Sequence, residues 1–290
     1  MTTHIELALG TVQFGTAYGI AGRGLAVPEG EVRAILALAA DRGIRVLDTA
    51  PNYGDIEDRL AHLVGDLPFE IVSKISALPP HASIGAAGAF VAESIARSIG
   101  RLGSRLSTLL FHREDDLFGP CGDAMWRAAE TASRGGLRLG VSCYGPETAI
   151  ALRRRYAIAV AQLPGNAFDQ RLAVPGVADG LQGVEIHLRS VFLQGLLVMP
   201  QADAVERIPA AVASLGAWSA WCSTRGVRPV TAALGIAKSL PGVRLCVVGV
   251  DRLEHLDEIL RAWDEAVPCS AAALASTSPD VIDPRRWTTA

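Results

Sequence analysis

The sequence lacks the features that mark several classes of protein. Its five cysteines are odd in number and widely spaced, and no two form a Cys-x-x-Cys pair, which argues against a disulfide framework. No apolar run approaches the ~18 residues needed to span a bilayer. The first residues carry no basic segment followed by an apolar one. The histidines and cysteines show no metal-site spacing, so we expect a cytoplasmic protein with neither membrane attachment nor a metal.

A surplus of positive charge is also missing. The formal net charge is -3 and the isoelectric point is near 6.1, and no block of like charge stands out along the chain. Proteins that hold a phosphate backbone need clustered Lys and Arg. Nucleic acid is therefore not an expected partner.

Apolar residues are what the sequence has in quantity. Of its 290 residues, 50% are hydrophobic and 20% are charged, which is enough to bury one large core. A (β/α)8 barrel of roughly 250 residues would use nearly the whole chain. We predict one barrel domain over residues 1–267. Residues 268–290, rich in Ala, Ser, Thr and Pro, are predicted to be a C-terminal loop over the barrel mouth or a loose tail.

The order of apolar and amphipathic segments favours an α/β fold. Short β-branched runs alternate with longer stretches of helical period, as in repeated βα units. The predicted strands are 6–10, 45–50, 70–75, 108–112, 138–143, 158–164, 184–191 and 244–250. The predicted helices are 28–41, 55–64, 87–100, 123–133, 146–155 and 253–264, with two more in 203–240 separated at 226–229. The chain reads GTVQFGTAYG from Gly10, without the Gly-x-Gly-x-x-Gly of an open Rossmann sheet. A closed parallel barrel is therefore favoured over an open sheet.

Polar residues end six consecutive predicted strands. In a barrel, the carboxyl ends of the strands form the face that carries active sites. A single strand-terminal Asp or Ser often only caps the following loop, but six in succession indicate a site, because apolar side chains would be less costly to bury there. The six residues are Asp48, Lys74, His112, Ser142, Gln162 and Arg189.

Tyr53 follows Asp48 by five residues, in a loop that can fold back over the barrel mouth. A tyrosine has a pKa of about 10 and is a poor acid at neutral pH, but a nearby ammonium stabilises its phenolate form. We expect Lys74 to supply that ammonium and Asp48 to hold Lys74 in place. His112 would then fix the oxygen of a carbonyl substrate beside Tyr53.

This set of residues resembles the catalytic tetrad of the aldo-keto reductase family. The similarity extends along nearly the whole chain, through the segments that begin at Leu9 (LGT), Asp48 (DTAPNYG), Val72 (VSK), Leu110 (LFH), Gly140 (GVS), Gln162 (QLPGN), Phe192 (FLQGLL) and Val248 (VGV). The resemblance implies a (β/α)8 barrel that reduces an aldehyde or ketone with NAD(P)H, or oxidises an alcohol such as a sugar. It assigns catalysis to Asp48, Tyr53, Lys74 and His112, with Tyr53 as general acid or base.

The resemblance also implies a cofactor site. Ser142 and Gln162 would hold the nicotinamide carboxamide, Gly10 and Thr11 would line the same pocket, and Leu193 and Gly195 would lie along the pyrophosphate. The family binds the 2'-phosphate of NADP after the last strand, which here means Gly249, Val250, Asp251 and Arg252.

Three positions depart from the family pattern. Cys143 stands where many members have a second carboxamide ligand, Asn, and a thiol is a weak replacement. Arg189 stands where many members stack a Tyr on the nicotinamide, so it either stacks there or binds an acidic substrate. Asp251 would repel a 2'-phosphate that Arg252 would attract. We expect NADP, with NAD as the alternative.

Other functions compatible with this sequence are a cofactor-binding regulatory or scaffold subunit with little turnover, and an isomerase or aldolase in which Lys74 forms a Schiff base. His112 favours an ordinary carbonyl substrate, because family members that reduce a steroid double bond have Glu there. Tyr18, Phe118 and Trp287 are candidate pocket aromatics. The physiological substrate, the direction of reaction and the oligomeric state stay open.

Overall fold

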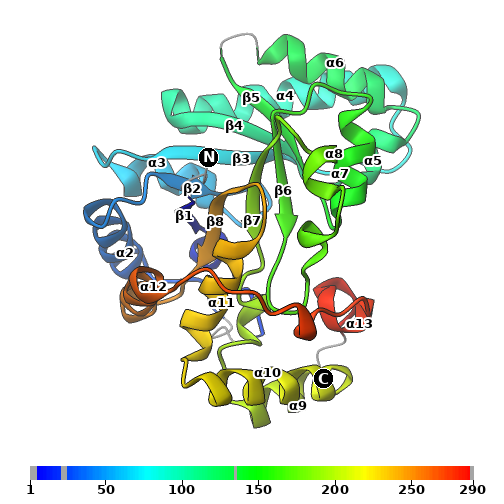
Figure 1. Cartoon of the computed structure of the whole chain (residues 1–290). Helices are drawn as coiled ribbons and strands as arrows, with labels where there is room; N and C mark the ends of the chain where they lie inside the picture. Colours follow the sequence, from blue (N-terminus) through cyan, green and yellow to red (C-terminus); the bar gives the residue numbers. More distant parts are fainter. Residues whose placement is uncertain (1–4, 21–24, 134–135, 288–290) are drawn as a thin grey trace.

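Eight parallel strands form a closed barrel in the computed structural model, which describes residues 5–20, 25–133 and 136–287 (Figure 1). Each strand pairs with the next in the sequence, and β8 pairs with β1 in a register that aligns Gly249 with Gly10. The strands are β1 (Glu6–Gly10), β2 (Val46–Asp48), β3 (Glu70–Ile75), β4 (Leu106–Phe111), β5 (Arg138–Ser142), β6 (Val160–Pro164), β7 (Glu185–Arg189) and β8 (Val243–Gly249). The predicted (β/α)8 barrel is confirmed.

Helices alternate with these strands and cover the outside of the barrel (Figure 1). Local signals explain several of their ends: the Ser83 hydroxyl accepts from the Ala86 N–H at the start of α4, and Gly226 takes a left-handed φ of 60° after α10. The longer helices are α2 (Glu29–Asp41), α3 (Ile56–Val64), α4 (Ile84–Leu102), α6 (Gly122–Ala132), α7 (Pro146–Arg153), α9 (Gln201–Arg207), α10 (Val212–Arg225), α11 (Pro229–Ser239) and α12 (Leu253–Glu265). Single turns form α1 (Val12–Gly15), α5 (Asp115–Phe118), α8 (Val177–Gly180) and α13 (Pro279–Ile282).

The segment 203–240 differs from its prediction. The expected break before Pro229 is present, but a second break at Ile208 separates α9 from α10, so three helices replace the predicted two. The residue before a proline is pushed out of the α conformation, and Ile208, which precedes Pro209, has φ -132° and ψ 75°. The sequence signal for this second break is Pro209.

The buried apolar residues form two main clusters. The larger cluster packs the strands against the surrounding helices. The second joins the segments after β6 and β7 to α9, α10, α11 and α13. The arrowhead of β6 points towards α13 and α10 in Figure 1, so this second cluster lies at the carboxyl ends of the strands. It forms the support for the face where the candidate site lies.

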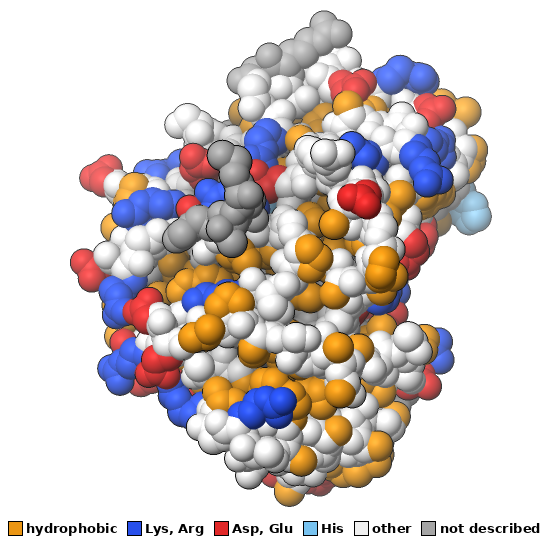
Figure 2. Space-filling view, viewed as in Figure 1, with side chains coloured by type: hydrophobic (Ala, Val, Ile, Leu, Met, Phe, Trp, Pro, Cys, Tyr) orange, Lys and Arg blue, Asp and Glu red, His pale blue; other side chains and the backbone are white. Residues whose placement is uncertain are grey.

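The face of the molecule seen in Figure 2 carries positive and negative side chains interspersed over its outer helices. Hydrophobic side chains are most frequent across its middle and lower parts. All five cysteines carry free thiols. Among the described helices, none is both long and apolar enough to cross a membrane.

Candidate active site

A buried ion pair joins the ends of β2 and β3. Lys74 Nζ lies 2.7 Å from Asp48 Oδ1 and donates to the Thr49 carbonyl at 2.8 Å, and the two side chains are 1% and 8% exposed. Burial lowers the pKa of Lys74, but the charge of Asp48 and the nearby Tyr53 outweigh it, so the pKa stands above its ordinary value. Lys74 is therefore a fixed ammonium, which disfavours the Schiff-base alternative because a protonated amine is not a nucleophile.

The second oxygen of Asp48 extends this pair across the barrel. Gln162 Nε2 donates to Asp48 Oδ2 at 2.6 Å, and the Ser142 hydroxyl donates to Gln162 Oε1 at 3.3 Å. Four strand ends, those of β2, β3, β5 and β6, are thereby connected by one chain of polar contacts. The predicted residues Lys74, Asp48, Gln162 and Ser142 are thus brought together.

Tyr53 and His112 lie above this chain of contacts. Lys74 Nζ is 5.3 Å from the centroid of the Tyr53 ring, and the Tyr53 and His112 rings meet edge to face at 6.0 Å. Burial and the positive charge of Lys74 lower the pKa of His112 to about 4, with Asp48 opposing and Arg189 adding to the effect. His112 is therefore neutral at neutral pH, and the predicted tetrad of Asp48, Tyr53, Lys74 and His112 converges on one place.

Two glycines hold the Tyr53 loop in position. A Cβ on Gly15 would lie 1.7 Å from the Tyr53 carbonyl oxygen, and a Cβ on Gly54, whose φ is +66°, would lie 2.3 Å from the Gly15 oxygen. Arg59 adds a hydrogen bond from its Nη1 to the Phe14 carbonyl at 3.0 Å. The loop and α1 therefore make direct backbone contact that only glycine permits. The sequence analysis missed this contact, although Gly54 directly follows Tyr53.

Glu57 is a second positioning group that the sequence analysis missed. This carboxylate on α3 is 2% exposed and accepts hydrogen bonds from Ser73, which precedes Lys74 in β3, and from Ser98 and Arg101 in α4. It therefore ties the helix that follows Tyr53 to the strand that carries Lys74. The sequence carries no clear signal of this role, because the partners of Glu57 lie 16 to 44 residues away.

A groove of about 670 Å³ crosses the carboxyl ends of the strands. The predicted site residues that line it are Gly10, Thr11, Asp48, Tyr53, Gln162, Arg189, Gly195, Gly249, Val250, Asp251 and Arg252, together with Tyr18. Three other predicted residues contact residues of the lining. Lys74 contacts Asp48, Ser142 contacts Gln162, and His112 contacts Tyr53. Cys143 and Leu193 are fully buried and outside its lining.

The groove has features that suit a dinucleotide. Gln13, which the sequence analysis missed, lines it, and its Oε1 is buried without a hydrogen-bond partner. A Cβ on Gly249 would lie 2.6 Å from the Gln13 amide, so glycine at this position leaves the room that the Gln13 side chain occupies in the groove. In the segment after β7, which contributes Ser190 and Gln194 to the groove, three non-glycine residues (Ser190, Leu193 and Gln194) have φ between 48° and 62°, a strained conformation that clusters at ligand sites.

Charged groups of both signs surround the far end of the groove, at the start of α12. His255 Nδ1 lies 2.7 Å from Asp251 Oδ1, and Arg252 Nε, 3.9 Å from the same oxygen, is buried without a hydrogen-bond acceptor. The Leu253 N–H, the first of α12, already donates to Glu31 Oε1 at 2.6 Å. An anion at this end would therefore meet Arg252 more readily than the first N–H of the helix.

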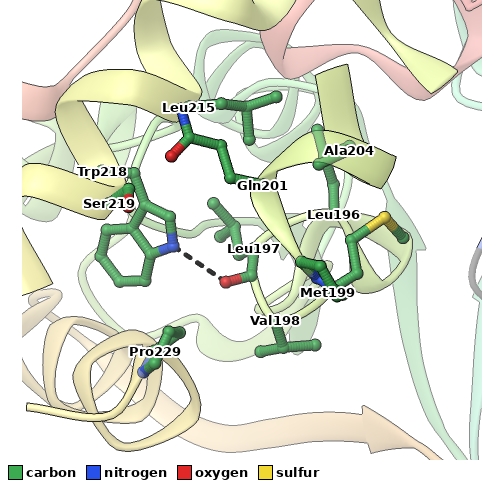
Figure 3. Close-up of a pocket in the computed structure, with 11 residues that line it drawn as sticks. Leu196, Leu197, Val198, Met199, Gln201, Ala204, Leu215, Trp218, Ser219 and Pro229 are labelled. Atoms are coloured by element: carbon green, nitrogen blue, oxygen red, sulfur yellow. Dashed lines mark hydrogen bonds between the residues drawn. The ribbon is translucent and has the colours of Figure 1, made fainter. Parts of the chain in front are cut away.

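A smaller cavity of about 330 Å³ lies beside the groove and shares Val198, Met199, Pro200 and Pro229 with its wall (Figure 3). The Trp218 indole N–H donates to the Leu197 carbonyl at 2.8 Å, so its one polar atom is satisfied. No titratable side chain lines this cavity. It carries no acid–base chemistry. Within the described ranges, no cluster of three or more His, Cys, Asp or Glu side chains is placed to hold a metal ion.

Comparison with known proteins identifies the family of this barrel, and that family supports an oxidoreductase acting on carbonyl compounds. The sequence profile described as "Aldo/keto reductase family" matches residues 6–275. The chain belongs to this family.

Solved structures agree in fold. A protein of Pseudomonas aeruginosa named as an aldo-keto reductase is 23% identical with a TM-score of 0.64, and 90% of each chain is covered. An aldo-keto reductase of Bacillus halodurans, described as a holo form, is 20% identical with a TM-score of 0.72, covering 97% of this chain and 95% of the other. At these identities the likeness shows the fold alone. A search of curated proteins finds no match.

The contact between Gly15 and Gly54 predicts that Gly15→Ala displaces the Tyr53 loop. Because a misplacement of about 1 Å near the reacting groups can lower a rate 10²-fold, we expect kcat to fall by about that factor. Gly30→Ala in α2, where an added Cβ meets nothing within 4 Å, is the matched control and should change kcat by less than about twofold. Equal kcat values in the two variants would contradict this role for Gly15.

The lowered pKa of His112 predicts a loss of stability in acid. Its pKa is about 4 in the folded chain against an ordinary 6.5, so between these values the unfolded chain binds more protons and stability falls as the pH falls. At about pH 5 this loss is about 2 kcal/mol relative to neutral pH. Urea unfolding of the wild type and of His112→Gln at both pH values measures it. The variant should lack this part of the loss, and an equal loss in both proteins would contradict the prediction.

Proposed function

We propose that the protein is an NADP(H)-dependent reductase of aldehydes or ketones, with Tyr53 as its proton donor. The observation that carries this proposal is the buried ammonium of Lys74, held by Asp48 beneath the Tyr53 ring at one end of the groove. A fixed positive charge stabilises the phenolate that remains after proton donation. The same groups, used in reverse, would take a proton from an alcohol.

The residues of the site have separate tasks in this mechanism. A bound nicotinamide dinucleotide would supply the hydride. Neutral His112 would hydrogen-bond the substrate oxygen and orient the carbonyl towards Tyr53. Tyr53 would transfer its hydroxyl proton to that oxygen as negative charge develops there, so that the product is the alcohol. Ser142 and Gln162 would hold the nicotinamide carboxamide, and Gly10, Thr11 and Gln13 would line the same part of the groove.

NADP is preferred over NAD because of the arrangement at the start of α12. Asp251 Oδ1 lies 2.7 Å from His255 Nδ1, so an imidazole stands beside the carboxylate that would repel a 2'-phosphate. Arg252 Nε has no acceptor, which leaves its guanidinium able to pair with a 2'-phosphate. Gly195 and the strained segment before it would follow the pyrophosphate.

The proposed catalytic unit is the barrel of residues 1–267, with the C-terminal segment shaping its mouth. In that segment α13 packs on the second apolar cluster, and Arg285 lies over the Tyr144 ring with its Cζ 3.4 Å from the centroid. Residues 288–290 lie outside the described residues. We expect the enzyme to act in the cytoplasm on a small-molecule substrate.

The mechanism predicts that Tyr53→Phe loses turnover while it keeps cofactor binding. General acid catalysis contributes 10²–10⁴-fold, so kcat should fall by at least about 10², whereas the NADPH affinity measured by fluorescence titration should stay within about twofold. Tyr156→Phe is the control, because its hydroxyl binds Asp123 and the Leu117 carbonyl away from the groove. Retained turnover in Tyr53→Phe would show that another group is the acid, and absent turnover in the wild type would favour a scaffold role.

The cofactor assignment predicts a preference for NADPH that depends on Arg252. Because a hydrogen bond to a charged group contributes about 1.5–3 kcal/mol, Arg252→Ala should lower the ratio of kcat/KM for NADPH over NADH by about tenfold or more. The control is Arg261→Ala, which removes an exposed arginine of the same helix that is paired with Asp257. A wild-type enzyme that prefers NADH would show that Asp251 determines the specificity.

A further inference from the structure

Arg189 is a cation without a carboxylate partner in the wall of the groove. Its Nη1 donates to the Ser190 hydroxyl at 3.3 Å and its Nη2 to the Cys143 carbonyl at 3.1 Å, and both acceptors are neutral. Its Nε is buried with no acceptor. Across the described part of the chain, no ion pair involves Arg189. A partly buried charge without a counter-ion is unfavourable unless a ligand supplies one.

The neighbouring cations are neutralised. Lys74 is paired with Asp48. Arg285, which shares the Tyr144 ring with Arg189, is paired with Asp283 at 2.7 Å. Burial would raise the pKa of Asp283, but Arg285 and, to a smaller extent, Arg189 lower it. The carboxylate of Asp283 is engaged by Arg285, so among the described residues Arg189 is left without an ion pair of its own at the mouth of the site.

Glu114, a carboxylate beside Tyr144, does not change this balance. Glu114 Oε2 accepts from the Tyr144 N–H at 2.7 Å, and burial raises the pKa of Glu114 above its ordinary value. Its charge contributes to the raised pKa of Arg285, and among the described residues it forms no ion pair with Arg189. Arg189 therefore keeps a net attraction for an anion.

Arg189 is also close to the reacting groups. It lines the same groove as Tyr53 and Gln162, and its charge helps to lower the pKa of His112. Its guanidinium is held in place by Ser190 and the Cys143 carbonyl, and its Cζ lies 4.4 Å from the Tyr144 ring centroid. Each Nη keeps a further N–H that could bind a ligand.

We propose that the substrate carries an anionic group, a carboxylate or a phosphate, which Arg189 binds while the carbonyl is reduced beside Tyr53. This inference rests on the proposed function and specifies its substrate class. Hydrogen bonds between a guanidinium and an anion are strong and directional. A charged substrate should therefore be preferred over a neutral one of the same shape by about 10- to 100-fold in kcat/KM.

The test compares matched pairs of aldehydes. The carboxylate arm uses 3- and 4-carboxybenzaldehyde against the corresponding formylbenzamides, which have the same shape without the charge. The phosphate arm uses glyceraldehyde 3-phosphate against glyceraldehyde. In the wild type, we expect the charged member of at least one arm to have the higher kcat/KM, by about tenfold or more. The arm that shows this preference identifies the anion.

Variants of the two arginines assign the preference to one cation. Arg189→Met and Arg189→Gln should bring the ratio of charged to neutral substrate close to one, and Arg189→Lys should retain part of it. Arg285→Met is the control, because it removes a cation beside the same Tyr144 ring that is already paired with Asp283. Its ratio should stay within about twofold of the wild type. Because each value is a ratio within one protein, losses of folded enzyme or of cofactor affinity cancel.

Different failures have different meanings. If the wild type reduces the neutral aldehydes but shows no preference for charge, the proposed function stands and the anion site is wrong. A preference that survives in Arg189→Met but disappears in Arg285→Met would also overturn the assignment to Arg189. If no aldehyde of either kind is reduced with NADPH or NADH, the proposed function fails, and the inference fails with it.

Discussion

The buried ion pair between Lys74 and Asp48 is the interaction on which the candidate site depends. Both charges are almost fully removed from water, and such pairs add little net stability compared with well-packed apolar residues. What this pair does is fix geometry. Asp48 uses one oxygen for Lys74 and the other for Gln162, so β2 is tied to its neighbour β3 and, across the barrel, to β6. Tyr53, His112 and the groove are arranged around that fixed point.

Around the ion pair, the site holds two neighbouring titratable groups, Lys74 and His112, in opposite protonation states. Lys74 stays an ammonium because Asp48 outweighs its desolvation, whereas burial and the positive charge of Lys74 keep His112 neutral. A neutral imidazole beside a fixed cation can orient a substrate oxygen without competing with Tyr53 as a proton donor. The opposite states of Lys74 and His112 thus follow from one ion pair and two depths of burial.

The sequence predicted those features that depend on local pattern. Strand-end residues such as Lys74 and His112 were identifiable because a polar residue after an apolar strand falls on the active face of any barrel. Contacts between residues far apart in the sequence could not be identified in this way. Gly15 meets Gly54 through backbone atoms, and Arg285 reaches the Tyr144 ring from 141 residues away, so no periodicity indicates either contact. The sequence therefore indicated which residues the barrel brings together, and it did not indicate the contacts that hold them in position.

Two of the departures from the family pattern belong to one arrangement. Cys143 is fully buried with its thiol towards Glu114, and burial raises the pKa of that thiol, so its side chain does not reach the groove as an Asn ligand would. Its backbone carbonyl instead accepts a hydrogen bond from Arg189. This carbonyl orients the Arg189 guanidinium at the edge of the groove, where the positive charge has no carboxylate partner among the described residues. At these two positions the chain therefore withdraws a side chain from the groove and places an oriented cation in its wall.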